Sequence, residues 1–186
     1  MTSVDFMILD WVQAHLRCGI LDMVMPWITA LGEFGAFWML LTVVFLIRRD
    51  TRQVGVMMAI ALALDVVLCN GIIKPLAARP RPFAVRPEIE LLIKAPRDYS
   101  FPSGHTAASF AAAGVMWFAR QRGRWAAMVL AALIGLSRIY LYVHYPSDVV
   151  CGAVLGLLCG AVGVFFARKG AERCKMRKNG QSGGPD

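Results

Sequence analysis

The chain has 186 residues, of which 58% are hydrophobic and only 17% are charged. This composition excludes an ordinary soluble domain and is typical of a protein dissolved in lipid. The formal net charge of +8 does not indicate a nucleic-acid partner, because the basic residues lie between apolar runs and not along a polar face with aromatic side chains. The sequence therefore predicts an integral membrane protein.

The first 34 residues contain two less regular apolar segments. Residues 4–16 place apolar side chains along one helical face, which predicts a helix lying in the membrane interface. Residues 20–31 are apolar but are interrupted by Asp22 and Pro26. Whether this second segment crosses the bilayer decides between five and six spans.

Five further segments are expected to cross the membrane, because about 20 apolar residues at about 1.5 Å each span a hydrocarbon layer of about 30 Å. They are residues 35–47, 54–73, 105–119, 125–142 and 149–167. The third is rich in alanine, and the last carries Gly152, Gly156 and Gly160, so both are expected to pack closely inside the bundle. The predicted fold is an all-α, polytopic transmembrane helical bundle of five or six spans, with residues 35–167 as its core.

Basic residues gather in two connections, residues 48–52 and 120–124, and in the tail, residues 168–186. Alternation of the helices places all three on one face, which the positive-inside rule makes cytoplasmic. Residues 74–100 and 143–147 then lie on the extracytoplasmic face of the plasma (inner) membrane. The longer of these outer loops is itself basic, against that rule, which indicates a site for an anion.

Three stretches at the outer ends of helices carry the candidate chemistry. The first is Lys74 followed by six residues and then Arg81 and Pro82 (KxxxxxxRP). The second, Pro102 to His105, reads PSGH, and the third (SRxxxxxHxxxD) contains the residues Ser137, Arg138, His144 and Asp148. Together, in this order, they resemble the three-part signature of the type 2 phosphatidic acid phosphatase superfamily. The resemblance extends to its small bacterial undecaprenyl pyrophosphate phosphatases.

The residue types suit the transfer of a phosphoryl group, whose charge spreads over the equatorial oxygens. Lys74, Arg81 and Arg138 supply positive charge and forked donors. Ser103 and Gly104 precede a helix, so their backbone N–H groups can bind phosphate oxygens. Lone basic residues at helix ends often have no such role, and only their combination favours the functional interpretation.

The two histidines of these stretches suit the two roles of covalent catalysis, an unprotonated nucleophile and a protonated acid. Asp148 lies four residues after His144, within reach of one ring N–H if the intervening turn leads into the last helix. The resemblance implies that His144 forms a phosphohistidine and that His105 protonates the leaving oxygen. It also implies that no metal and no cofactor takes part, and the sequence offers no metal-ligand cluster.

The expected activity is hydrolysis of a lipid phosphate or pyrophosphate at the outer leaflet, with undecaprenyl pyrophosphate as the expected substrate. Phosphatidic acid and phosphatidylglycerol phosphate are alternatives. A protein that binds or transports lipid phosphates without turnover is an alternative of another class. Asp65, an acid in the middle of an apolar helix, is either a structural hydrogen-bonding group or part of the substrate path.

Overall fold

The computed structural model describes residues 2–181, and the side chains of residues 3–172. All regular elements in this part of the chain are helices. The longer ones are α1 (Thr2–His15), α2 (Gly19–Leu31), α3 (Ala36–Ile47), α4 (Arg52–Asp65), α7 (Gly104–Phe118), α8 (Arg124–Tyr140) and α9 (Pro146–Gln181). The shorter ones are η1 (Glu33–Gly35), η2 (Val66–Ile73), α5 (Lys74–Ala77) and α6 (Pro82–Val85).

The predicted all-helical class is confirmed, and each of the five predicted segments is helical. The segment 54–73 begins in α4 and continues through η2, whose hydrogen bonds have π-helical spacing. Two stretches, Arg52–Val85 and Pro146–Glu172, are long and apolar enough to cross a membrane. The pair Gly19–Leu31 and Glu33–Ile47, bent by 41°, adds a third if it forms one span. A count of five or six spans stays a prediction.

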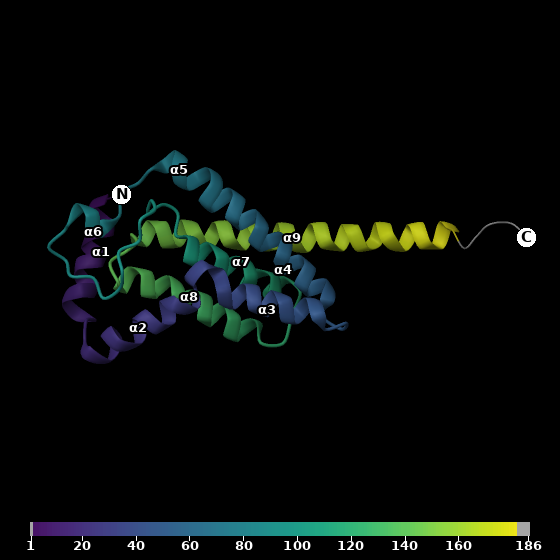
Figure 1. Ribbon diagram of the computed structural model, residues 1–186, viewed down its shortest axis with the longest axis horizontal. Coiled ribbons are helices and arrows are strands. Elements are labelled where there is room, and N and C mark those ends of the chain that lie inside the picture. Colours follow the sequence, from purple (N-terminus) through teal and green to yellow (C-terminus); the bar gives the residue numbers. More distant parts are fainter. Residues whose placement is uncertain (1, 182–186) are drawn as a thin grey trace, which may run out of the picture.

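Helix α7 lies at the centre of the bundle, as its alanine-rich sequence predicts. Nine of its residues are buried, and it packs along α9, which extends beyond the other helices at its C-terminal end (Figure 1). The glycine stripe of α9 faces α7. A Cβ atom at Gly156 would come within 2.2 Å of the Ala107 carbonyl oxygen, so only glycine permits this backbone contact.

The two ends of the molecule differ in composition. The α3–α4 and α7–α8 connections lie at the same end as the C-terminal part of α9, and α1, α6 and the long loop lie at the other (Figure 1). The predicted basic connections therefore share one end of the bundle. The three motif stretches converge on the opposite end.

Helix α1 is tied to this motif-bearing end by a buried acid. Asp5 is 4% exposed. Its carboxylate accepts hydrogen bonds from the Ser147 backbone N–H at 3.0 Å and from Arg79 Nη2 at 2.8 Å. Leu9 and Val12 are buried on the same side of the helix. The interfacial position predicted for α1 remains untested, but its inner face packs against the turn that precedes α9.

We expect Gly156→Ala to lower the free energy of unfolding by about 1–3 kcal/mol, because the added methyl group forces α9 and α7 apart. Gly170→Ala is the matched control in the same helix, where a Cβ atom would meet nothing within 4 Å. It should be neutral or stabilising by up to about 1 kcal/mol, from helix propensity. Thermal unfolding midpoints of the purified protein in detergent measure both changes, and equal midpoints for the two variants would contradict the packing account.

Candidate active site

A cavity of about 940 Å³ opens at the motif-bearing end of the bundle. Six of the eight residues predicted for the site line it, and they come from all three motif stretches: Lys74, Arg81, Gly104, His105, Arg138 and His144. The other two, Ser103 and Asp148, are fully buried behind this lining. The structure therefore brings together residues that lie up to 74 positions apart in the sequence, from Lys74 to Asp148.

The spacing between Arg138 and His144 follows from how α8 ends. Tyr142 takes a left-handed backbone conformation (φ 59°), which turns the chain back over the last helical turn. The backbone N–H groups of Val143 and His144 then donate to the Arg138 carbonyl at 3.2 and 3.3 Å. This closed turn fixes the histidine beside the arginine and leads directly into α9 at Pro146.

The contacts of His144 define which ring nitrogen carries the proton. Its Nε2 lies 3.1 Å from Arg81 Nη1. A guanidinium group can only donate, so Nε2 must accept with its lone pair and Nδ1 must hold the hydrogen. Nδ1 lies 3.4 Å from Asp148 Oδ2, but it makes no hydrogen bond to any residue that the structure describes. Burial, followed by the charges of Arg81, Arg138 and Lys74, lowers the pKa of His144 well below 6.5, which keeps the ring neutral with its lone pair toward Arg81.

Asp148 is itself held in place from three directions. Its Oδ2 accepts hydrogen bonds from Ser100 Oγ at 2.5 Å and from the Tyr145 backbone N–H at 3.0 Å. Its Oδ1 accepts one from Arg79 Nη1 at 2.5 Å. Arg79 Nη2 also donates a hydrogen bond to Asp5 on α1. The Asp148 carboxylate is therefore linked through Arg79 to Asp5.

Lys74 and Arg81 share one acidic partner, Asp98 of the long loop. Lys74 Nζ and Arg81 Nη2 both donate to its carboxylate, the latter at 2.7 Å. Burial raises the pKa of Asp98, but the hydrogen bond and charge of Lys74, together with those of Arg81, outweigh it and hold the pKa below its usual range. The Asp98 side chain is 53% exposed, so this acid sits at the rim of the cavity.

The remaining predicted residues divide between lining and support. A Cβ atom at Gly104 would lie 3.5 Å from Lys74 Nζ, so glycine keeps the start of α7 open beside that cation. The Ser103 hydroxyl instead lies 2.8 Å from Thr106 Oγ1, and its backbone N–H donates to the Asp148 carbonyl at 3.1 Å. Arg138 is 2% exposed and donates from Nη1 to Thr29 Oγ1 at 2.7 Å.

The additional cations of the long loop have different roles. Lys94 and Arg97 line the cavity. Arg79 is paired with Asp5 and Asp148, and Arg86 with Asp10 on α1. Only two of the four therefore add positive charge to the cavity itself.

Asp65 also lines the cavity and is 1% exposed. Its Oδ1 has no hydrogen-bond partner among the residues that the structure describes. A buried unpaired oxygen is uncommon, and both roles considered for this acid stay predictions.

Several residues at the site fall outside the motif positions used for prediction, and those that form ion pairs include Asp5, Glu33, Arg79 and Asp98. Asp98 lies seven residues before His105, and Arg79 lies inside the first motif as an unspecified position. The feature that could have indicated Arg79 and Asp98 is the requirement that a buried charged side chain has a partner of opposite charge. Asp5 and Glu33 lie in the N-terminal 34 residues, where no local pattern indicates a site.

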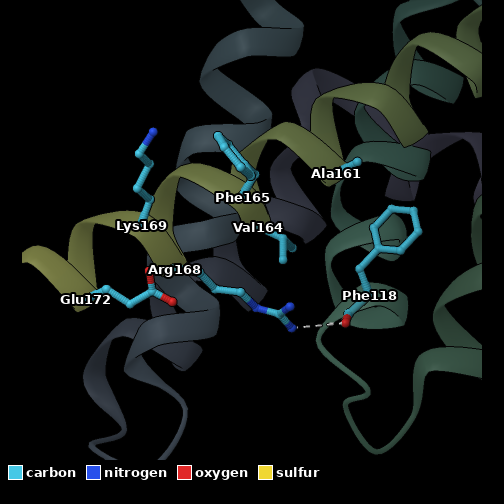
Figure 2. A pocket seen from close by; sticks show the side chains of 7 residues that line it. All are labelled: Phe118, Ala161, Val164, Phe165, Arg168, Lys169 and Glu172. Carbon is cyan, nitrogen blue, oxygen red and sulfur yellow. Dashed lines mark hydrogen bonds between the residues drawn. The ribbon is translucent and has the colours of Figure 1, made fainter.

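A second hollow, of about 560 Å³, lies at the other end of α9. Figure 2 shows Arg168 reaching the Phe118 carbonyl oxygen, at 3.4 Å, while Lys169 points the other way. Phe165 and Val164 form its apolar wall. It contains none of the predicted site residues, and its residues suit contact with lipid.

The curated relatives that resemble this chain in sequence include the following two. A bacitracin transport permease protein, BcrC, of Bacillus licheniformis is 34% identical over 147 residues, covering 78% of this chain and 72% of the relative. An undecaprenyl-diphosphatase of Sulfolobus acidocaldarius is 33% identical over 120 residues, covering 64% of this chain and 58% of the relative.

Two solved structures resemble the fold. Aquifex aeolicus LpxE matches with a TM-score of 0.74 and 29% identity, covering 86% of this chain and 93% of that one. A phosphatidylglycerolphosphate phosphatase of Bacillus subtilis matches with a TM-score of 0.71 and 27% identity, covering 92% and 86%. The family model of the PAP2 superfamily matches residues 50–170, which include all three motif stretches. The chain thus belongs to the PAP2 superfamily, whose members in these comparisons include membrane lipid phosphatases.

Proposed function

We propose that this PAP2 protein hydrolyses a lipid pyrophosphate, or a lipid phosphate, through a phosphohistidine on His144. The observation that carries the proposal is the contact set of His144. Its Nε2 lone pair lies on a cavity lined by Lys74, Arg81 and Arg138, and its Nδ1 faces Asp148. A neutral nitrogen beside three cations is suited to attack a phosphorus atom whose oxygens those cations bind.

In the first step the Nη1–H of Arg81 leaves His144 Nε2 for a phosphate oxygen, and the freed lone pair of Nε2 attacks the terminal phosphorus. The bond from that phosphorus to the leaving oxygen breaks. The leaving oxygen is the bridging oxygen of a pyrophosphate or the ester oxygen of a monoester, and it takes the electron pair of the broken bond and a proton from His105. In the second step a water molecule loses a proton to His105 and attacks the phosphohistidine. The phosphorus–nitrogen bond then breaks and its electron pair returns to Nε2. Asp148, 3.4 Å from Nδ1, stabilises the positive charge that the ring carries in the intermediate.

We propose that the reaction needs no metal and no cofactor, because the three cations supply the charge that a metal would supply. Within residues 3–172, no three His, Cys, Asp or Glu side chains gather as a set that could hold a metal ion. The partners are the lipid substrate and the surrounding membrane lipids, and nucleic acid has no part in this function.

The proposed location is the plasma (inner) membrane, with the cavity on its extracytoplasmic face. The separation of the basic connections from the motif-bearing end supports this orientation (Figure 1). On that face the proposed substrate is undecaprenyl pyrophosphate, converted to undecaprenyl phosphate. The named activity of the Sulfolobus relative supports it, as do Lys94 and Arg97, which add charge suited to a diphosphate.

Two alternatives have specific observations behind them. The structural likeness to a phosphatidylglycerolphosphate phosphatase favours a phosphate monoester of a glycerolipid, such as phosphatidylglycerol phosphate or phosphatidic acid. The name of the Bacillus licheniformis relative favours a transport protein. Transport or binding alone does not require an orienting carboxylate behind His144, and this favours an enzyme.

His144→Ala should reduce phosphate release by about 10³-fold or more, because the variant lacks the attacking nitrogen. His105→Ala should slow release from a lipid phosphate, yet still form the phosphoenzyme on a substrate with a good leaving group. The measurement is phosphate release from lipid substrates by the purified protein in detergent. His15→Ala is the matched control, since His15 is an exposed histidine of α1 outside the cavity.

Near wild-type turnover by His144→Ala would make the nucleophile assignment wrong. The same assay in excess chelator should proceed at an unchanged rate. A loss of activity that a divalent ion restores would contradict the proposal of metal independence.

Labelling of single cysteines tests the orientation, after the five native cysteines have been replaced. Cysteine at Glu88 in the long loop should react with an impermeant thiol reagent in intact cells. Cysteine at Arg122, in the α7–α8 connection, should react only after the cells are opened. Both positions are exposed, and the reverse labelling pattern would place the cavity in the cytoplasm.

The ratio of kcat/KM values identifies the substrate. We expect kcat/KM to be higher for undecaprenyl pyrophosphate than for phosphatidic acid and phosphatidylglycerol phosphate, because two phosphates engage more of the cavity's cations. A tenfold preference corresponds to about 1.4 kcal/mol of transition-state stabilisation. A tenfold preference for either glycerolipid would exclude the pyrophosphate as the main substrate but leave the mechanism in place.

A further inference from the structure

The turn that joins α2 to α3 lies directly against the ring of His105. A Cβ atom at Gly32 would come within 2.9 Å of His105 Cδ2, so only glycine allows this approach. Phe34 and Gly35 follow with left-handed backbone angles, φ 48° and 67°. A phenylalanine in this region is strained, and such strain tends to be kept where a side chain must be held in one place.

Glu33 is the residue that this turn presents to His105. Its Oε2 lies 3.3 Å from His105 Nε2, and both residues line the cavity. The end of α2 is fixed one turn earlier by the 2.7 Å hydrogen bond from Arg138 to Thr29. The N-terminal segment therefore contacts two of the predicted site residues, through side chains that belong to no motif.

The surroundings of His105 make an acidic partner necessary for its proposed role. The cavity that it lines also contains Lys74, Arg81, Arg138 and the neutral His144, and three cations oppose a proton on a nearby imidazole. The acids at this cavity are Asp65, Glu33 and Asp98. Asp98 is engaged by Lys74 and Arg81, and Glu33 contacts the His105 ring itself.

We propose that Glu33 is a positioning residue for His105, a role that rests on the proposed function. The Nε2–H group of His105 donates to the Glu33 carboxylate, which fixes the ring and stabilises its protonated form. Nδ1 is then the nitrogen that exchanges a proton with the substrate. As the bond from phosphorus to the leaving oxygen breaks, the Nδ1 proton passes to that oxygen, and Nδ1 keeps the electron pair. The Nε2 hydrogen stays between the ring and Glu33.

The simpler interpretation is an ordinary surface ion pair, because the Glu33 side chain is 55% exposed. Such a pair has little effect on stability and does not discriminate between leaving groups. The two interpretations therefore differ in how the activity of a Glu33 variant depends on the substrate.

Two phosphate monoesters separate these interpretations in the purified full-length protein. Octyl phosphate releases an alkoxide that needs a proton, and 4-nitrophenyl phosphate releases a stable phenolate that does not. Glu33→Gln should lower kcat/KM for octyl phosphate about tenfold or more, within the range of general acid catalysis. Its kcat/KM for 4-nitrophenyl phosphate should stay within about twofold of wild type. Glu33→Asp keeps the charge and should recover part of the loss on octyl phosphate.

Glu88→Gln is the matched control, because Glu88 is an exposed acid that does not line the cavity. This variant should leave kcat/KM unchanged for both monoesters. In the His105→Ala background, Glu33→Gln should have no further effect, because the two residues act as one unit. An equal loss on both monoesters, no loss on either, or an additive loss with His105→Ala would each overturn the positioning role. If wild-type protein hydrolyses neither monoester and no lipid phosphate or pyrophosphate, the proposed function itself fails.

Discussion

The candidate site depends on the planar, donor-only guanidinium group of Arg81. It donates to the Asp98 carbonyl at 2.8 Å, to the Val143 carbonyl at 2.7 Å and to His144 Nε2 at 3.1 Å. These contacts join the first motif stretch to the long loop and to the turn before α9. A lysine ammonium lacks this fixed fork and cannot make the same set of contacts. One side chain thus sets both the shape of the cavity and the lone-pair direction of the proposed nucleophile.

Charge at this end of the bundle is balanced by acids outside the motif positions first assigned. A cation buried in an apolar bundle is costly unless a partner compensates it. Asp98 forms ion pairs with Lys74 and Arg81, and Asp5 forms one with Arg79. Because the Asp5–Arg79 pair also contacts Asp148, helix α1 supports the carboxylate that faces His144. Helix α1 therefore contributes to the candidate site through Asp5.

Much of the fold and six of the residues that line the cavity could be predicted from the sequence. Helix positions follow from apolar runs, and the glycine stripe of α9 follows from the need for close backbone contact with α7. The motifs contain Lys74, Arg81, Arg138 and His144. Their close approach in space could therefore be predicted from the sequence. The backbone N–H of Ser103 was predicted to bind a phosphate oxygen, and in the structure it donates to the Asp148 carbonyl. Its position at the start of α7 follows from the sequence, but this contact with α9 does not.

The contacts of Asp5 and Glu33 could not be predicted, because each depends on how two distant helices meet. Asp5 lies 142 residues before its partner Ser147, and periodicity carries no information about such a pairing. The same holds for Gly32. The reason for a glycine at this position is evident only when the α2–α3 turn is placed against His105. The motifs predict the residues that are proposed to react, but they do not predict Asp5, Glu33 and Gly32, which lie outside the motifs.

The two histidines of the cavity differ in their hydrogen-bonding contacts. His144 is 1% exposed, accepts from a cation at Nε2 and is held by a backbone turn, so its lone pair is kept unprotonated. His105 begins a helix, is more accessible and faces a carboxylate at Nε2. Because the cavity's cations oppose a proton on either ring, the protonated imidazole of the proposed mechanism depends on the contact between Glu33 and His105. This asymmetry supports the assignment of attack to His144 independently of the motif spacing, since exchanging the roles would require a proton where Arg81 already donates.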